Sequence, residues 1–195
     1  MCIKSEINES IAKDFITDSS DFLKRYKMLE KKSISGHKGL RSKLLVDLIF
    51  AAECALKGLI ILTSKEDIQL IYKKICTHNL TKLLSFLPEN EKSNCKNFLD
   101  DIFINYSIAN RYMVEVYKTF EECGCLSVDY YDTIANPEWF ANVYENLKKL
   151  HDYVWNKVTI PIVGGIFGVF DLDKIEKEHN LRINLGKKKN DLIVL

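Results

Sequence analysis

Residues 40–62 read LRSKLLVDLIFAAECALKGLIIL, and the pattern of this stretch decides the fold class of the chain. Its apolar residues recur three and four positions apart, as on one face of an amphipathic α-helix. They are Leu44, Leu45, Leu48, Ile49, Ala52, Ala55, Leu56, Leu59 and Ile60. Glu53 and Lys57 lie four residues apart in this apolar background, so the carboxylate can meet the ammonium one turn later. The pattern predicts a core helix.

The composition is that of one globular domain, or of one domain with an appendage. A chain of 195 residues can bury a core without disulfides or metals. Its six cysteines are scattered, no secretory leader is present, and no apolar run is long enough to span a bilayer. These features predict a cytoplasmic protein with reduced thiols and no membrane association. Cys123 and Cys125 have no second pair at zinc spacing, so we expect no metal and no cofactor.

The rest of the sequence predicts an up-and-down helical bundle with short connections. The further helices are expected over residues 4–32, 66–76, 79–87, 91–122 and 137–157, with loops over 33–39 and 126–135. Capping residues around Asp18–Ser20 favour an interruption of the first helix. Asn136 and Pro137 are a strong start signal for the last one, an N-cap followed by proline at the first helical position.

From Val158 onward the pattern becomes β-like. VTIPIV and IFGVF flank a glycine turn, residues 171–180 predict a short polar helix, and residues 181–195 predict a β-hairpin. The chain is therefore divided into a bundle over residues 1–157 and a C-terminal appendage over residues 158–195. A lone hairpin is marginal in water, so we expect the appendage to form a small sheet or to lend an edge to a partner chain.

The helix expected over residues 91–122 has two apolar faces. One carries Leu99, Phe103, Tyr106, Met113, Tyr117 and Phe120, and the other carries Ile104 and Ile108 in line with Arg111 and Glu115. A surface helix would leave the second face polar. This pattern predicts a homodimer through that face, because exposed apolar patches usually mark contacts.

Net charge is +1, which argues against a strongly electrostatic nucleic-acid binder, but the charge is uneven. Residues 24–43 hold eight basic side chains and one acidic side chain, Glu30. They are Lys24, Arg25, Lys27, Lys31, Lys32, Lys38, Arg41 and Lys43. This segment is either a phosphate-contacting patch or a solvated helix end without a ligand.

Two segments together, AAECALKGLI (residues 51–60) and THNLTKLL (residues 77–84), resemble the core signature of HEPN-domain proteins. The likeness covers roughly residues 40–155 and includes the segment YSIANRYMVEVY around Arg111. It implies a helical bundle whose second helix carries the Glu and Lys, and whose third opens near His78. Many HEPN proteins act in defence and toxin–antitoxin systems, as nucleases or as non-catalytic partners that bind nucleotides, RNA or a companion protein.

HEPN ribonucleases pair an Arg with a His four to six residues later, and this chain resembles them only at the Arg. The His is missing, because the residues four to seven positions after Arg111 are Glu115, Val116, Tyr117 and Lys118. An Arg binds phosphate but cannot shuttle protons, and neither Tyr117 nor Lys118 is suited to general-base work near neutrality. We therefore expect no catalytic residues and no robust ribonuclease activity.

The expected function is that of a catalytically degenerate HEPN-like protein that binds a phosphate-bearing ligand or a partner protein. The candidate ligand-binding residues are Glu53, Lys57, His78, Asn110, Arg111, Glu115, Tyr117 and Lys118. Two alternatives stay open: an endoribonuclease with a diverged site, and a structural or regulatory bundle without a ligand. Arg111 can equally be neutralised by Glu53 and Glu115, and His78 can be a cap or packing residue.

Overall fold

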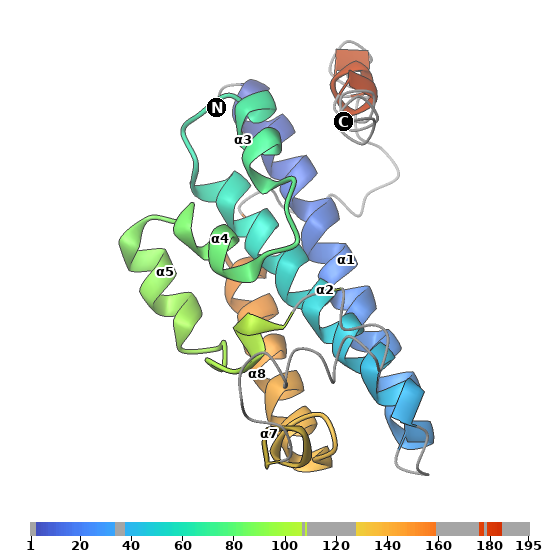
Figure 1. Ribbon diagram of the computed structural model, residues 1–195. Coiled ribbons are helices and arrows are strands. Elements are labelled where there is room, and N and C mark those ends of the chain that lie inside the picture. The colour runs from blue at the N-terminus through green and yellow to red at the C-terminus, as the bar shows by residue number, and fades with distance from the viewer. Residues whose placement is uncertain are drawn as a thin grey trace, which may run out of the picture.

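The computed structural model describes residues 3–33, 38–106, 108, 128–158, 176–177 and 179–184 (Figure 1). These residues are mainly helical, and no strand occurs among them. None of the helices within these ranges combines the length and the apolar character needed to cross a bilayer. The mainly helical character of these residues agrees with the helical part of the expected fold class.

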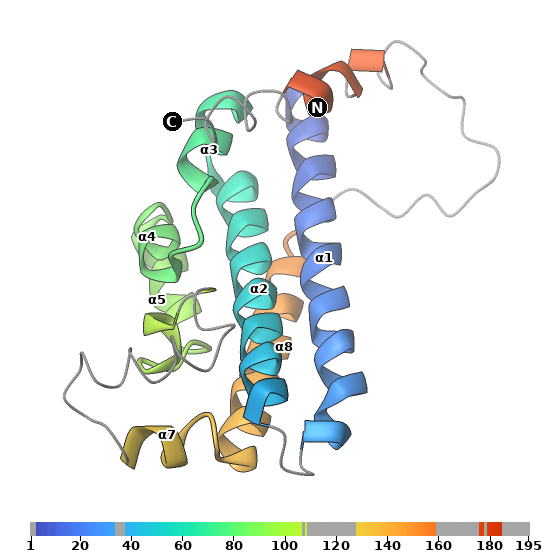
Figure 2. The same cartoon turned by 45° about the vertical axis from the view of Figure 1, so that its right-hand side comes forward.

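Three long helices form the body of the protein. They are α1 (Ile3–Ser33), α2 (Lys38–Thr63) and α8 (Pro137–Trp155), and α2 packs against both of the others. The shorter elements α3 (Ile68–Ile75), α4 (Leu80–Ser85), α5 (Glu89–Lys96) and the 3₁₀ helix η1 (Phe103–Asn105) lie on one side of α2 (Figure 2). A short helix, α7 (Val128–Asp132), lies beside the start of α8 (Figure 2).

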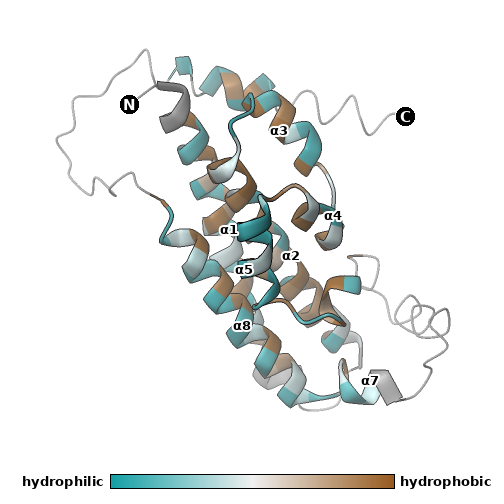
Figure 3. Cartoon of the chain, turned by 90° about the vertical axis from the view of Figure 1, so that its left-hand side faces the viewer, coloured by the Kyte–Doolittle hydropathy of each residue, from teal (hydrophilic) through white to brown (hydrophobic). Residues whose placement is uncertain are grey.

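The expected core helix is confirmed as α2, and every apolar residue assigned to its buried face is at most 3% exposed. The long α8 alternates hydrophilic and hydrophobic residues along its length, as a helix with one buried face does (Figure 3). Its start signal is also confirmed, because the Asn136 side chain accepts hydrogen bonds from the backbone N–H groups of Glu138 and Trp139. A proline occupies the first turn, as predicted.

The first helix is continuous, so the interruption expected around Asp18–Ser20 is wrong. Ser19 is 1% exposed and its hydroxyl donates to the carbonyl oxygen of Ala51 at 2.8 Å. A hydroxyl that donates to a carbonyl oxygen of a neighbouring helix does not compete for the hydrogen-bonding groups of its own helix backbone. The polar cluster in α1 therefore serves the α1–α2 contact instead of ending the helix.

A single helix over residues 91–122 is also wrong, because α5 ends at Lys96 and turns lead to η1. The Asp100 carboxylate accepts hydrogen bonds from the backbone N–H groups of Ile102 and Phe103, which starts a new turn. Leu99, Phe103 and Tyr106 are nevertheless buried, as the apolar stripe predicted for these three residues, although they do not lie on one continuous helix. Residues 107 and 109–122 of the expected helix lie outside the described residues.

The face predicted to form a homodimer is described only at its start. Ile104 and Ile108 are partly buried and pack against the core of their own chain. The positions of Arg111 and Glu115 lie outside the described residues, so the dimer stays a prediction.

Two further local predictions differ from the structure. Residues 128–132 form α7 where a loop was expected. Residues 179–184 are helical, although LRINL was assigned to a β-hairpin. Leu181 packs against the core, and the Arg182 guanidinium forms an ion pair with Asp14 of α1 and a hydrogen bond with the Ser10 hydroxyl. These contacts favour the helix, because it places Leu181 against the core and Arg182 against α1. The other predicted strands of the appendage lie outside the described residues.

A buried carboxylate joins α5 to the end of α8. Glu91 is 7% exposed and accepts hydrogen bonds from Lys157 Nζ at 2.8 Å and from the Tyr153 hydroxyl at 2.7 Å. Burial alone would raise the pKa of Glu91, but these two donors outweigh it and hold that pKa below its ordinary value. Lys157 and Tyr153 thus hold the outer helix α5 on the bundle.

We expect the protein to lose stability as the pH falls below about 6.5, because of His151 on α8. Burial lowers the pKa of His151, Asp152 partly raises it, and Lys24 lowers it again. A lowered folded-state pKa means that the unfolded chain takes up a proton that the folded chain resists. The contribution of His151 is therefore fully present above the ordinary imidazole pKa and is lost as pH falls towards the lowered value.

Urea unfolding at several pH values tests this expectation. The control is His151→Phe, which keeps a ring beside Trp155, whose own ring centroid lies 6.3 Å from that of His151. The variant should lose less stability than the wild type on acidification. Equal losses in both proteins would contradict the assignment to His151.

Candidate functional site

The centre of the candidate site is the Glu53 carboxylate in the middle of α2. Lys57 Nζ lies 2.6 Å from Glu53 Oε1, one turn along the same helix. His78 Nδ1 lies 2.9 Å from Glu53 Oε2 and 3.1 Å from Oε1. Glu53 is 3% exposed and Lys57 9% exposed, whereas the His78 side chain is 55% exposed. A buried ion pair therefore supports one histidine at the surface.

His78 is held by the local structure of the connection between α3 and α4. The next residue, Asn79, is the N-cap of α4, and its side chain accepts from the Lys82 backbone N–H at 2.8 Å. The Thr77 hydroxyl accepts from the Asn79 backbone N–H at 3.3 Å. The edge of the imidazole meets the Phe50 ring of α2, with 6.3 Å between ring centroids. The backbone caps and the ring contact together limit the orientations open to His78.

The contact with Glu53 decides which nitrogen of the His78 imidazole is left to interact with a ligand. An ionised carboxylate only accepts hydrogen bonds. Nδ1 of His78 therefore carries the proton and donates a hydrogen bond to Glu53. In neutral His78 the other nitrogen, Nε2, is then an acceptor. Within the described part of the chain, Nε2 makes no hydrogen bond. This nitrogen can accept a proton from a ligand, or donate one when the ring is charged.

An open groove of about 360 Å³ adjoins His78. It is lined by Thr77, His78, Asn79, Leu80, Thr81, Ile104, Asn105 and Tyr106. The Tyr106 hydroxyl is 3.0 Å from the Thr133 hydroxyl, which fixes the ring at the groove wall. The groove therefore combines hydroxyl and amide groups from the α3–α4 connection with the wall formed by η1.

Cys54, the residue after Glu53, is not a nucleophile. Burial raises the pKa of the Cys54 thiol to about 12, and the Glu53 carboxylate adds to the shift. The reactive form of cysteine is the thiolate, which is scarce at neutral pH when the pKa is so high. In the ranges that the structure describes, no three side chains of the His, Cys, Asp and Glu types are grouped to hold a metal ion.

The structure brings together three of the eight predicted site residues, namely Glu53, Lys57 and His78. The other five, Asn110, Arg111, Glu115, Tyr117 and Lys118, lie outside the described residues. Sequence reasoning missed Asn105 of the groove, and it assigned Tyr106 to a helical core stripe. No feature of the sequence indicated that Asn105 and Tyr106 line a groove. This wall of the groove forms only because the chain leaves α5 and turns into η1.

Comparison of the chain with protein-family models, with curated proteins and with solved structures gave no match. The functional argument therefore rests on the geometry around His78.

Proposed function

We propose that this chain is a catalytically degenerate HEPN-like protein that binds a phosphate-bearing ligand, a nucleotide or RNA, in the groove beside His78. The observation that carries the proposal is a half-exposed imidazole held by a buried carboxylate at the edge of a groove of about 360 Å³. That volume lies in the range of about 300–1,000 Å³ typical of small-molecule sites. The proposal includes action together with a partner protein in a defence or toxin–antitoxin system.

Charge supports a phosphate as the recognised group. Lys57 neutralises Glu53, so protonation of His78 gives the three side chains a net positive charge. The charged imidazole then donates through Nε2 to a phosphate oxygen while Nδ1 stays on Glu53. Thr77, Thr81 and Asn105 supply further polar groups for a ribose or a base. The resemblance to HEPN proteins implies a further, bidentate phosphate contact from Arg111, which lies outside the described residues.

Substitution of His78 by alanine should weaken nucleotide binding about tenfold or more, the worth of one hydrogen bond to a charged group. Isothermal titration with the ribonucleoside monophosphates measures this directly. His179→Ala is the matched control, because His179 is also exposed and lies in the C-terminal helical segment. No binding by the wild type, or equal binding by both variants, would contradict the proposal.

A second candidate, a metal-independent endoribonuclease with a diverged site, is favoured by the same Glu53–His78 contact. Neutral His78 Nε2 could take the proton of a 2′-hydroxyl, as a general base does. We still expect no robust cleavage, because no His follows Arg111 at the family spacing. Incubating the protein with single-stranded and structured RNA in the presence of a chelator separates the two functions. Cleavage lost in both His78→Ala and Arg111→Ala would establish the ribonuclease.

A further inference from the structure

The hydrogen bond between His78 and Glu53 leaves the neutral His78 ring without a donor for a ligand. Nδ1 lies 2.9 Å from Glu53 Oε2, and the carboxylate requires a proton on that nitrogen. The other neutral form of the ring, with its proton on Nε2, would set the lone pair of Nδ1 against the carboxylate. Nε2 is therefore an acceptor in the neutral ring and becomes a donor only when the imidazole is charged.

The groove offers no permanent positive charge in place of a charged imidazole. None of the described residues that line it is a lysine or an arginine. Lys57 is 9% exposed, and its ammonium is held by Glu53 at 2.6 Å. In the basic segment, residues 24–43, carboxylates hold three of the cations, with Lys24 on Asp21, Lys27 on Glu30 and Arg25 on Asp47. Within the described part of the chain, the positive charge for a phosphate in the groove therefore comes from a proton on His78.

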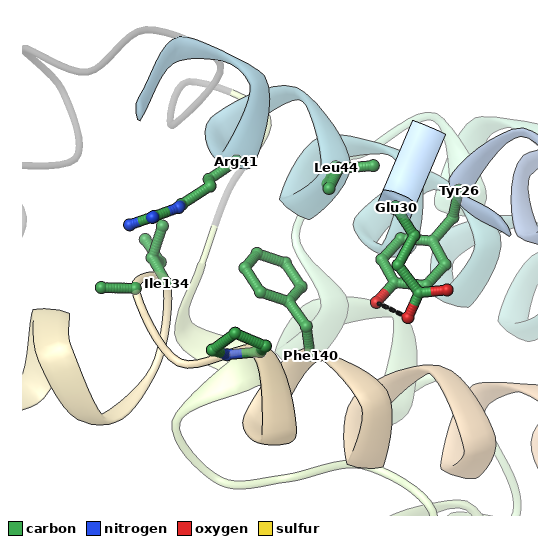
Figure 4. A pocket seen from close by; sticks show the side chains of 8 residues that line it. Tyr26, Glu30, Arg41, Leu44, Ile134 and Phe140 are labelled. Atoms are coloured by element: carbon green, nitrogen blue, oxygen red, sulfur yellow. Dashed lines mark hydrogen bonds between the residues drawn. The ribbon is translucent and has the colours of Figure 1, made fainter. Parts of the chain in front are cut away.

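A second pocket does have a permanent positive charge and serves for comparison. It has a volume of about 60 Å³, lies where α1, α2 and the start of α8 meet, and is bordered by Arg41 (Figure 4). Figure 4 shows Arg41 reaching toward Ile134, while Glu30, which accepts a hydrogen bond from Tyr26, lies on the far side of the Phe140 ring. A guanidinium stays protonated at any ordinary pH, so an anion bound beside Arg41 takes up no proton.

We propose that the groove beside His78 binds its phosphate together with a proton, so that the site holds a phosphate-bearing ligand at mildly acidic pH and releases it as the pH rises. The inference rests on the proposed function, because it takes the phosphate ligand of the same groove as given. Neutral Nε2 and an ionised phosphate oxygen are both acceptors and form no hydrogen bond. The charged ring donates a hydrogen bond to the phosphate and offsets part of its negative charge.

The direction of the pH dependence follows from which state of His78 binds the ligand. Because the charged ring is preferred, binding draws a proton onto the ring, and the affinity falls by up to about tenfold for each unit by which the pH rises. Imidazole is the side chain that ordinarily changes its charge between about pH 5 and 8. The phosphate itself acts in the opposite direction, because its second ionisation, at about pH 6, adds negative charge as the pH rises.

Other titratable groups lie on the elements around His78 and require controls. They are Glu53 and Lys57 of α2, Asp18 of α1, Cys76 at the end of α3, Lys82 of α4, and Asp101 and Tyr106 beside the groove wall. Thiols ordinarily begin to ionise at about pH 8, and a thiolate would also repel phosphate. Cys76 is exposed, so Cys76→Ser is one control. Burial, and less strongly Asp21, raises the pKa of Asp18, so Asp18→Asn is the other.

The test is isothermal titration of the full chain with adenosine monophosphate at about pH 6 and about pH 8. Two buffers with different ionisation enthalpies are used, because the dependence of the heat on the buffer gives the number of protons taken up. We expect binding to be at least about tenfold weaker at the higher pH, with a net uptake of protons there. Cys76→Ser, Asp18→Asn and His179→Ala should behave as the wild type does. His78→Gln keeps an amide donor but does not titrate, so its affinity should not fall as the pH rises.

Nitrogen NMR of the wild type labelled at its histidines gives a measurement that needs no variant for its result. In the free protein at about pH 8, the Nδ1 resonance of His78 should be that of a protonated nitrogen and the Nε2 resonance that of an unprotonated one. Addition of adenosine monophosphate should move the Nε2 resonance toward the protonated position. An Nε2 resonance that is protonated in the free neutral ring would overturn the inference.

The outcomes separate this inference from the proposed function. Binding that is weakened in His78→Ala, but is equal at both pH values and takes up no proton, would overturn the inference and leave the proposed function intact. Loss of the pH dependence in Cys76→Ser or Asp18→Asn would also overturn the inference alone. No binding by the wild type at either pH would overturn both. So would proton-independent binding that persists in His78→Ala and is lost in Arg41→Gln, because it would place the anion beside Arg41.

Discussion

Replacing Glu53 by alanine is expected to destabilise the protein by about 3–5 kcal/mol, the largest effect of any single polar substitution considered for this fold. Lys57 is 9% exposed and its ammonium lies 2.6 Å from Glu53 Oε1. Removal of the carboxylate leaves a buried cation without a partner, and a buried unpaired charge costs far more than a buried pair contributes. The midpoint of urea unfolding measures the loss.

The matched control removes both charges at once. Glu53→Leu combined with Lys57→Met replaces the ion pair by apolar groups of similar volume, in a helix whose neighbouring residues are already apolar. Such replacements are often neutral or stabilising. We expect the double variant to recover most of the stability lost in Glu53→Ala. If the two proteins unfold at the same urea concentration, the unpaired-lysine explanation fails.

Substitution of Gly58 by alanine should cost about 1–3 kcal/mol, although alanine is the better helix former by about 1 kcal/mol. A Cβ atom at this position would lie 2.8 Å from Ile16 Cγ1 and 3.2 Å from the Ala12 carbonyl oxygen. Ile16 is fully buried, and the carbonyl belongs to the backbone of α1, so neither yields freely. The missing side chain of Gly58 lets α1 and α2 approach closely at this crossing.

Gly39 provides the control for this prediction. It lies in the same helix, and a Cβ atom there meets nothing within 4 Å. Gly39→Ala is expected to leave stability unchanged or to raise it by up to about 1 kcal/mol through lower chain entropy in the unfolded state. Thermal or urea unfolding of both variants gives the comparison. A loss of stability in Gly39→Ala as large as that in Gly58→Ala would show that the close approach of α1 and α2 at Gly58 is not the cause of the loss there.

The helices that could be predicted are those whose signals are local. The apolar spacing of residues 44–60 requires a buried face, and it predicted α2 with its core residues. Asn136 and Pro137 marked the start of α8 because an N-cap and a first-turn proline act within a few residues. The Glu53–Lys57 pair was foreseen for the same reason, since one turn of helix places the two side chains together.

The errors arose where a turn-forming contact or a contact between helices outweighed the apolar pattern. Leu99, Phe103 and Tyr106 have helical spacing and are buried, yet Asp100 binds backbone groups and interrupts the helix. Apolar spacing identifies which residues are buried, but a turn followed by a 3₁₀ helix can bury the same residues. In the C-terminal segment, the packing of Leu181 against the core and the ion pair of Arg182 with α1 accompany a helix where β-like composition favoured a strand.

The sequence by itself determined a mainly helical bundle, the central helix with its buried face, and the ion pair within that helix, because each depends on residues no more than a few positions apart. Only the tertiary structure decided that His78 binds Glu53, which lies 25 residues earlier in the chain. It also decided that η1 forms the second wall of the groove and that Arg41 borders a pocket against Ile134 and Phe140. These contacts depend on how separate helices pack, and no periodicity within one helix specifies its neighbours.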